Sequence, residues 1–267
     1  MDWDRYFELV KLRDSGHVEE AILELAKLGE GAEDRLSKAL VLMEIANGLR
    51  LLEHNSDARR KIAEACQLLG PQHEYYPRAA FLAAEVDMDE ENWKGALKKL
   101  DGILEKYTPV LNTDDHKDLL EKVQQNRGIA LTQLKRFREA CAVLETLRSV
   151  EYERVATLCY LGICEFELGD PEGAKRDFQQ MLSLDPSSVF QATAHQYLGV
   201  MFLRQGQLAR AKFEFERCLA CPDRGTLREA DLLKWLVDSS NGLNLRDDAA
   251  RYSEMLKKAH TIRSDKI

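Results

Sequence analysis

The sequence predicts an all-α fold in which antiparallel helix pairs repeat along the chain. The first observation is an alanine that recurs at intervals of 37, 38, 44, 34, 37 and 38 residues: Ala21, Ala58, Ala96, Ala140, Ala174, Ala211 and Ala249. The second is a bulky residue four positions later at six of the seven sites: Leu25, Ile62, Leu100, Leu144, Phe178 and Phe215, with Ser253 at the seventh. A period in the thirties is typical of stacked helical arrays, in which each unit packs only on its neighbours.

The first helix of each predicted unit carries an apolar stripe and a small residue. In the fifth unit Leu158 and Leu161 lie at helical spacing, and Gly162 lets a second helix approach closely. The equivalent place is held by Gly128, Gly199, Ala46 and Ala84 in other units.

Short turns separate the two helices of each pair. Gly169 suits the left-handed residue that ends a helix, and Asp170 with Pro171 suits the cap and first turn of the next helix. The same place is held by Ser15-Gly16, Lys135-Arg136 and Gln205-Gly206.

These residues match the W-x2-L-G-x2-Y…A-x3-F…P pattern, with Pro186 at its end, and the chain resembles the tetratricopeptide-repeat family over nearly its whole length. The resemblance implies a right-handed superhelical solenoid of about seven repeats, forming a single domain over residues 1–267. The expected repeats are 2–35, 39–72, 77–106, 121–154, 155–188, 192–225 and 230–260.

The 44-residue interval is ten longer than the family's repeat of 34, which places an insertion near residues 106–117. Pro109 is expected to break the helix there, and the following Asn-Thr-Asp-Asp run has turn and cap chemistry. We expect an extended second helix followed by a surface loop. The alternative is a loop that contacts a partner.

The charge and hydropathy of the chain exclude several classes of partner. The net charge is −8 and no long run of Lys and Arg occurs, which argues against nucleic-acid binding. The longest apolar stretches fall far short of the roughly 18 residues that span a bilayer. Residues 1–6 are acidic and amphipathic, unlike a secretion signal. We therefore expect a cytoplasmic protein that binds neither nucleic acid nor membrane.

The sequence contains no nucleophile motif, phosphate-binding loop or paired catalytic carboxylates, so no enzymatic activity and no cofactor are predicted. Six cysteines include one C-x2-C pair, Cys218 and Cys221, which alone is weak evidence for zinc. Reduced, mostly buried thiols explain all six, and no metal is expected.

The resemblance also implies where a partner binds, because in this family the first helix of each pair lines a concave groove through its positions 2, 5, 9 and 12. In the three central units the implied surface comprises Gln125, Ile129, Thr132, Cys159, Ile163, Phe166, Gln196, Val200 and Leu203. An apolar surface with interspersed amide and hydroxyl groups suits an amphipathic helix or an extended peptide with apolar anchors. The alternative is that some of these side chains only pack between neighbouring first helices.

The charged residues at equivalent positions flank this surface. Arg13 and Arg50 lie toward the N-terminus, whereas the third and seventh units are acidic, with Glu85, Asp87, Asp89, Asp231 and Asp238. A partner with basic residues around an apolar anchor would complement this arrangement.

One subgroup of the family binds the C-terminal carboxylate of heat-shock chaperones through a clamp of Lys, Asn and Arg. This chain has Asn47 and Lys122 at two of those positions, but Met43, Leu82 and Asn126 at the others. Too few donors remain to hold a carboxylate, so no chaperone clamp is expected.

Together the observations predict a non-enzymatic interaction scaffold, or adaptor, that binds a peptide or helix of a partner protein in its groove. Two alternatives stay open. One is a structural solenoid that self-associates as a homo-oligomer, suggested by Trp3, Tyr6 and the apolar first helix. The other is a regulator that senses a signalling peptide or small ligand.

Overall fold

The computed structural model describes residues 1–151, 153–222, 224 and 228–264. For residues 260–264 it describes the backbone alone. These residues form α-helices joined by short turns, with one short 3-10 helix and no strand anywhere in this described part. The all-α prediction is therefore confirmed.

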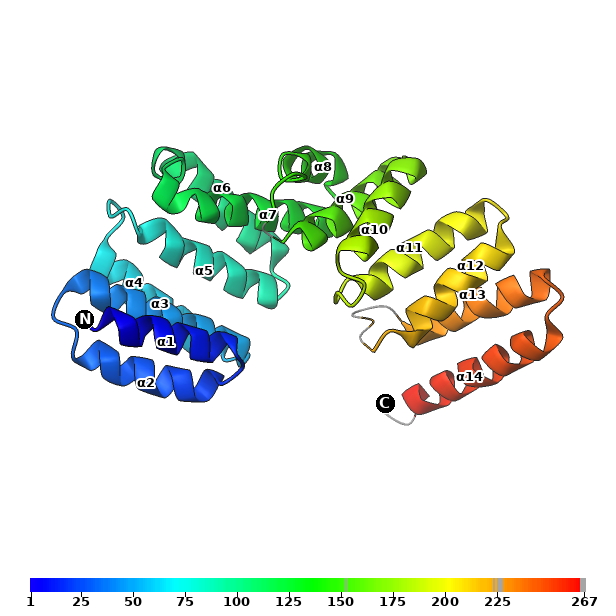
Figure 1. The fold of residues 1–267 in the computed structure, drawn as a ribbon, viewed down its shortest axis with the longest axis horizontal. Helices are drawn as coiled ribbons and strands as arrows, with labels where there is room; N and C mark the ends of the chain where they lie inside the picture. The colour runs from blue at the N-terminus through cyan, green and yellow to red at the C-terminus, as the bar shows by residue number, and fades with distance from the viewer. Residues whose placement is uncertain (152, 223, 225–227, 265–267) are drawn as a thin grey trace. The chain divides into compact units, whose positions relative to one another are not determined.

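The chain divides into two compact units, residues 1–136 and 137–267. Figure 1 labels the helices of each. The N-terminal unit contains α1 (Trp3–Asp14), α2 (Val18–Glu30), α3 (Arg35–Leu51), α4 (Asn55–Leu69), α5 (Tyr76–Asp89), α6 (Trp93–Leu111), η1 (Asp114–His116) and α7 (Lys117–Gln133). The C-terminal unit contains α8 (Phe137–Glu145), α9 (Arg154–Leu168), α10 (Pro171–Leu184), α11 (Gln191–Arg204), α12 (Leu208–Ala220), α13 (Glu229–Gly242) and α14 (Arg246–Ser264). The division falls at the turn inside the predicted fourth repeat, and the count of seven repeats in one domain stays a prediction.

The recurring alanine marks the closest approach of the two helices in each pair. Six of the seven alanines are fully buried and the seventh, Ala249, is nearly so. In α9 and α10 a Cβ on Gly162 would lie 2.9 Å from the ring of Phe178. Gly199 has the same relation to Phe215. The missing side chain on one helix thus makes room for an aromatic ring from the other.

The turn between the two helices of each pair contains a residue with positive φ. Gly16, Gly169 and Gly206 hold this place in three pairs, as the sequence indicates. In the other pairs the place is taken by Glu53, Glu91, Lys135 and Asn244. Asp170 caps α10 by accepting a hydrogen bond from the amide of Gly173 at 2.9 Å.

The prediction that Pro109 breaks its helix is wrong, because α6 continues through it to Leu111. Pro109 lies in the last turn, so the helical hydrogen bond that it cannot donate to the carbonyl of Glu105 is lost only near the end of the helix. Leu111 is fully buried against Leu119 and Val123 of α7, and this contact stabilises the end of α6. The second helix is extended as expected, and η1 replaces most of the expected loop.

None of the helices in the described residues combines the length and the apolar character needed to cross a membrane.

Two glycine substitutions test the close approach directly. Gly162→Ala should lower the free energy of unfolding by about 1–3 kcal/mol, because the added methyl group meets the ring of Phe178. Gly102→Ala, inside α6 with no atom within 4 Å of the added carbon, should raise it by about 0.5–1 kcal/mol. Urea unfolding followed by circular dichroism measures both. Equal effects of the two substitutions would contradict this account of the packing.

Candidate functional site

The first helices of the pairs lie closer to one another than the second helices do. In the C-terminal unit α9 contacts α11, whereas no comparable contact joins α10 to α12 within the described residues. In the N-terminal unit α1, α3, α5 and α7 contact one another in order. Each unit therefore has an inner face, formed by α1, α3, α5 and α7 in the N-terminal unit and by α9 and α11 in the C-terminal unit.

In the C-terminal unit the predicted groove residues Ile163, Phe166, Gln196, Val200 and Leu203 form one partly exposed surface on α9 and α11, here called the inner patch. Each of the five side chains is half-buried and still reaches solvent. All but Gln196 pack against the main hydrophobic core of this unit.

Phe166 is held in place by an aromatic and a cationic neighbour. Its ring meets the ring of Tyr197 edge-on, with centroids 5.0 Å apart. The guanidinium carbon of Arg204 lies 4.6 Å from the centroid of the Phe166 ring. Tyr197 in turn stacks on Phe178 in the core, and burial raises the pKa of its hydroxyl to about 12. The inner patch is consequently a fixed surface with an aromatic centre.

Three of the predicted groove residues are buried. Cys159 is fully buried in the core of the C-terminal unit, and Gln125 and Thr132 are buried in α7. Thr132 Oγ1 donates a hydrogen bond to the carbonyl of Gly128 at 2.9 Å. The remaining residue, Ile129, is half-buried on α7 of the N-terminal unit. The role of the whole set in binding stays a prediction.

The inner face of the N-terminal unit carries a ladder of ion pairs. Arg13 of α1 pairs with Glu44 of α3. Arg50 of α3 pairs with Asp89 of α5, at 3.1 Å between Nη1 and Oδ2. The ladder ends with a 3.0 Å pair from Arg78 of α5 to Asp118 of α7. The arginines that the sequence places at a basic end are thus neutralised by carboxylates of the next first helix.

Asp87 does not belong to the acidic flank where the sequence analysis places it. Its side chain is buried between α4 and α6, where Arg59 donates to Oδ1 at 2.7 Å and Lys99 donates to Oδ2. Burial alone would raise the pKa of this carboxyl, but the two hydrogen bonds hold it below its usual value. The position on α5 faces the second helices, so Asp87 joins helix pairs and does not face the groove.

A similar network fixes α9 behind the inner patch. Arg148 donates to both carboxylate oxygens of Asp177 on α10, at 2.5 and 3.0 Å, and to Glu165 Oε1 on α9 at 3.3 Å. Burial, and secondly the charge of Asp177, raise the pKa of Glu165 to about 7 against the opposing effect of Arg148. Glu165 immediately precedes Phe166, so this network holds the turn of α9 that carries Phe166 of the inner patch.

The thiols of the C-x2-C pair donate hydrogen bonds to backbone carbonyls. Cys218 Sγ donates to the carbonyl of Ala192 and Cys221 Sγ to that of Arg217, both at 3.3 Å. Burial raises the pKa of the Cys218 thiol to about 12, which disfavours the thiolate that a metal would need. No group of three or more His, Cys, Asp or Glu side chains suited to a metal ion occurs among the residues that the structure describes.

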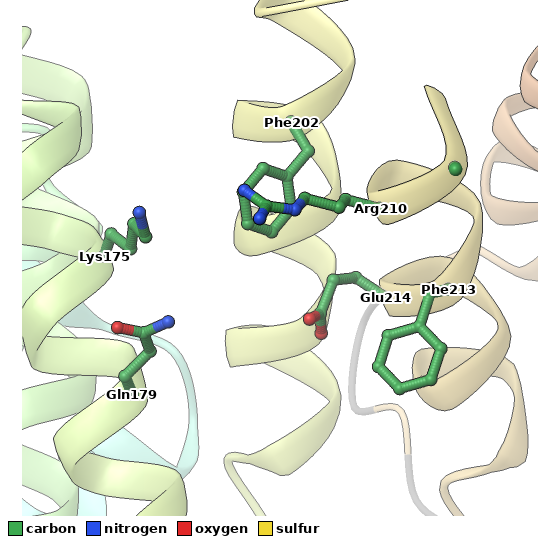
Figure 2. Close-up of a pocket in the computed structure, with 7 residues that line it drawn as sticks. Lys175, Gln179, Phe202, Arg210, Phe213 and Glu214 are labelled. Carbon is green, nitrogen blue, oxygen red and sulfur yellow. The ribbon is translucent and has the colours of Figure 1, made fainter. Parts of the chain in front are cut away.

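The structure also contains a hollow that the sequence analysis misses. It lies between α10 and α12, with Phe202 of α11 at its base and Phe213 at its side (Figure 2). The available signal was Phe213 between Arg210 and Arg217 in the second helix of the predicted sixth unit. The Phe213 ring is exposed, and the guanidinium carbon of Arg217 lies 5.7 Å from its centroid.

Comparisons with known proteins support the family resemblance. Residues 155–188, the predicted fifth repeat, match the sequence model of the tetratricopeptide repeat. No curated protein matches the chain.

Solved structures with the same fold cover most of the chain. The apo form of the quorum sensor NprR from B. thuringiensis has a TM-score of 0.75 at 16% identity, over 96% of this chain and 74% of that one. PilF from Pseudomonas aeruginosa has a TM-score of 0.66 at 18% identity, over 84% and 92%. YrrB, described as a TPR protein with an unusual peptide-binding site, has a TM-score of 0.51 at 17% identity, over 69% and 86%. At these identities the likeness shows the fold, a tetratricopeptide-like helical array.

The raised pKa of Glu165 gives a test of the network behind the patch. The folded protein binds this proton more tightly than the unfolded chain, so its stability falls as the pH rises through about 5 to 8. Glu165→Gln removes the ionisation. Relative to the parent, the variant should gain about 1 kcal/mol of unfolding free energy between the two ends of that range, after allowance for solvent screening. Urea unfolding at both pH values measures the difference, and a difference independent of pH would show that Glu165 is not perturbed.

Proposed function

Because this chain is a tetratricopeptide-repeat protein, we propose that it acts as a non-enzymatic scaffold that binds a peptide or helix of a partner on the inner face of its first helices. The fold itself is that of protein–protein interaction scaffolds in general. The finer proposal is that the inner patch is a principal contact surface.

The observation that carries the proposal is the half-buried aromatic and aliphatic surface of α9 and α11. Phe166 sits at its centre between Tyr197 and Arg204, and Leu203 and Val200 lie along α11. A partner side chain that packs here meets groups already ordered by the core, so little conformational entropy is lost on the side of the scaffold. That YrrB, which shares the fold, is described as having a peptide-binding site, although an unusual one, is in keeping with peptide binding as the activity.

The charges beside the patch favour a partner with basic residues near its apolar anchor. Glu167 lies close enough to Tyr197 to raise the pKa of the Tyr197 hydroxyl. Asp238 is exposed on α13, the next first helix. Rim charges of this kind steer association more than they strengthen it.

We also propose a cytoplasmic location. All six cysteines are free thiols, in keeping with a reducing compartment.

Two substitutions in the inner patch test the proposal. Phe166→Ala removes the aromatic centre, and Leu203→Asp places a charge on the apolar surface. Each should reduce the amount of co-purified partner at least about tenfold, because central anchors dominate such interfaces. The measurement is affinity purification of the tagged protein from its own cell extract at low and moderate salt, read by mass spectrometry.

Leu184→Asp is the matched control, because Leu184 is exposed at the end of α10 and lies outside the inner patch. It should leave partner recovery unchanged, and circular dichroism should show that all three variants are folded. If a stoichiometric partner is retained by both patch variants, the inner patch is not the binding surface.

Self-association is a second candidate, favoured by exposed apolar side chains at the N-terminal end. Tyr6 is buried, but Trp3, Phe7 and Leu23 are 45%, 56% and 65% exposed. Trp3 and Phe7 lie side by side on α1, with ring centroids 6.4 Å apart. A second copy of the chain could cover these rings.

A double substitution tests this candidate. If the protein dimerises through this surface, Trp3→Ser with Phe7→Ser should raise the dimer dissociation constant at least about tenfold, because the aromatic area that drives association is lost. Leu51→Ser, at an exposed leucine at the end of α3, is the control and should leave it unchanged. Sedimentation velocity over a range of concentrations gives the constant, and a strict monomer throughout that range removes the candidate.

A further inference from the structure

The hollow between α10 and α12 is a direct consequence of how the helix pairs stack. Both helices pack against α11, but no comparable contact joins them to each other in the described residues. The space left between them is a cavity of about 500 Å³. Figure 2 shows Lys175 and Gln179 on one wall, Phe202 at the base, and Arg210, Phe213 and Glu214 on the other wall. We refer to it as the outer hollow, since its walls are second helices.

The outer hollow offers an aromatic surface at two depths. Phe202 is 7% exposed, so the base is fixed by packing in the core. Phe213 is 54% exposed, so its ring forms an accessible apolar side of the hollow. An apolar side chain that enters the hollow would touch the edge of Phe202 and cover Phe213.

Cations surround both rings. Lys175 Nζ lies 5.9 Å from the centroid of the Phe202 ring, and Arg210 Cζ lies 5.6 Å from it on the other wall. Arg217 Cζ lies 5.7 Å from the centroid of the Phe213 ring. All three groups fall in the range of cation–π attraction and are thereby held near the rings.

These cations have little intramolecular compensation. Neither Arg210 nor Arg217 has a carboxylate partner among the residues the structure describes, and Lys175 has a single 3.9 Å contact to Glu172 on its own helix. Among the described residues that line the hollow Glu214 is the one acid, and its Oε2 is bound to Nδ1 of the buried His195 at 2.6 Å. The described lining thus has two cations, Lys175 and Arg210, against one acid, with Arg217 beside Phe213, on a chain whose net charge is −8.

We propose that the outer hollow binds an acidic peptide segment with an aromatic anchor. The anchor would pack on Phe213 against the base formed by Phe202, and flanking carboxylates would pair with Arg210, Arg217 and Lys175. Gln179 can hydrogen-bond the peptide backbone. This surface lies on the second helices and favours acidic segments, whereas the inner patch lies on the first helices and is flanked by acids. The two surfaces thus suit different partners.

The test uses a short end-blocked peptide in which a central phenylalanine is flanked on both sides by aspartates and glutamates, labelled for fluorescence anisotropy. It should bind the full chain, with an affinity that falls as salt is added. Phe213→Ala and Arg210→Glu should each weaken binding about tenfold or more. Both residues are largely exposed, so folding should be unaffected. A peptide with alanine in place of the phenylalanine should bind at least about tenfold more weakly.

Matched controls separate this site from the inner patch. Phe7→Ala and Arg35→Glu change an exposed phenylalanine and an exposed arginine of the N-terminal unit and should not alter binding. Phe166→Ala should also leave binding unchanged. The proposal is wrong if no binding occurs up to about 1 mM peptide, which would be weaker than a useful site. It is equally wrong if Phe166→Ala alone abolishes binding, or if a single-stranded oligonucleotide of equal charge binds more tightly than the peptide.

Discussion

The close approach of two helices at a residue with little or no side chain is the constraint on which the rest of this structure depends. In α9 and α10 the absent side chain of Gly162 and the single methyl group of Ala174 leave room for the ring of Phe178. In α11 and α12 Gly199, Ala211 and Phe215 repeat the arrangement. Because interiors are packed to near-crystal density, an added carbon on one helix must displace a ring that also contacts the next pair. Phe178 stacks on Tyr197 of α11, so the spacing within one pair sets the packing of the following one.

Polar contacts, of which those of Asp87 and Asp177 are buried, then join successive pairs. Asp87 is held by Arg59 from the preceding pair and by Lys99 from its own second helix, and Asp177 is held by Arg148. In the last pairs Lys212 of α12 donates to Asp248 of α14 at 2.9 Å, and Tyr252 donates to Glu216 at 2.6 Å. Such pairs add little net stability over apolar packing, but a misaligned pair would leave a charge buried without a partner. We interpret them as contacts that fix the register between helices.

The sequence could predict what is local and periodic. The alanine and its bulky follower lie four residues apart, so burial of the whole set followed from helical spacing alone. The left-handed conformation of Glu53, Glu91 and Asn244 was not predicted. Residues other than glycine rarely adopt it, and here the helices on either side of the turn require it. The continuation of α6 through Pro109 depends on burial of Leu111, a tertiary contact. The ladder of arginine ion pairs joins residues that are 31 to 40 positions apart in the sequence. The position of an arginine within a repeat therefore does not show whether it is paired in such a ladder or exposed on the surface. For the same reason the position rule found the half-buried Phe166 and Leu203 but could not separate them from the fully buried Cys159.

Two surfaces, the inner patch and the outer hollow, follow from one asymmetry in the stacking. First helices that contact each other present a continuous row of side chains, whereas second helices held apart leave hollows floored by the helix between them. In α11 Phe202 lines the outer hollow and the adjacent Leu203 lies in the inner patch, because neighbouring positions on a helix point about 100° apart. The two surfaces are joined through α11 and through α10, which packs on α9 and whose Phe178 stacks on Tyr197 of α11. Tyr197 and Phe215 are each stacked on a second aromatic ring, an arrangement that resists small displacements. In the two binding modes proposed above, the charges around the aromatic anchors distinguish the partners, and no change in shape is required.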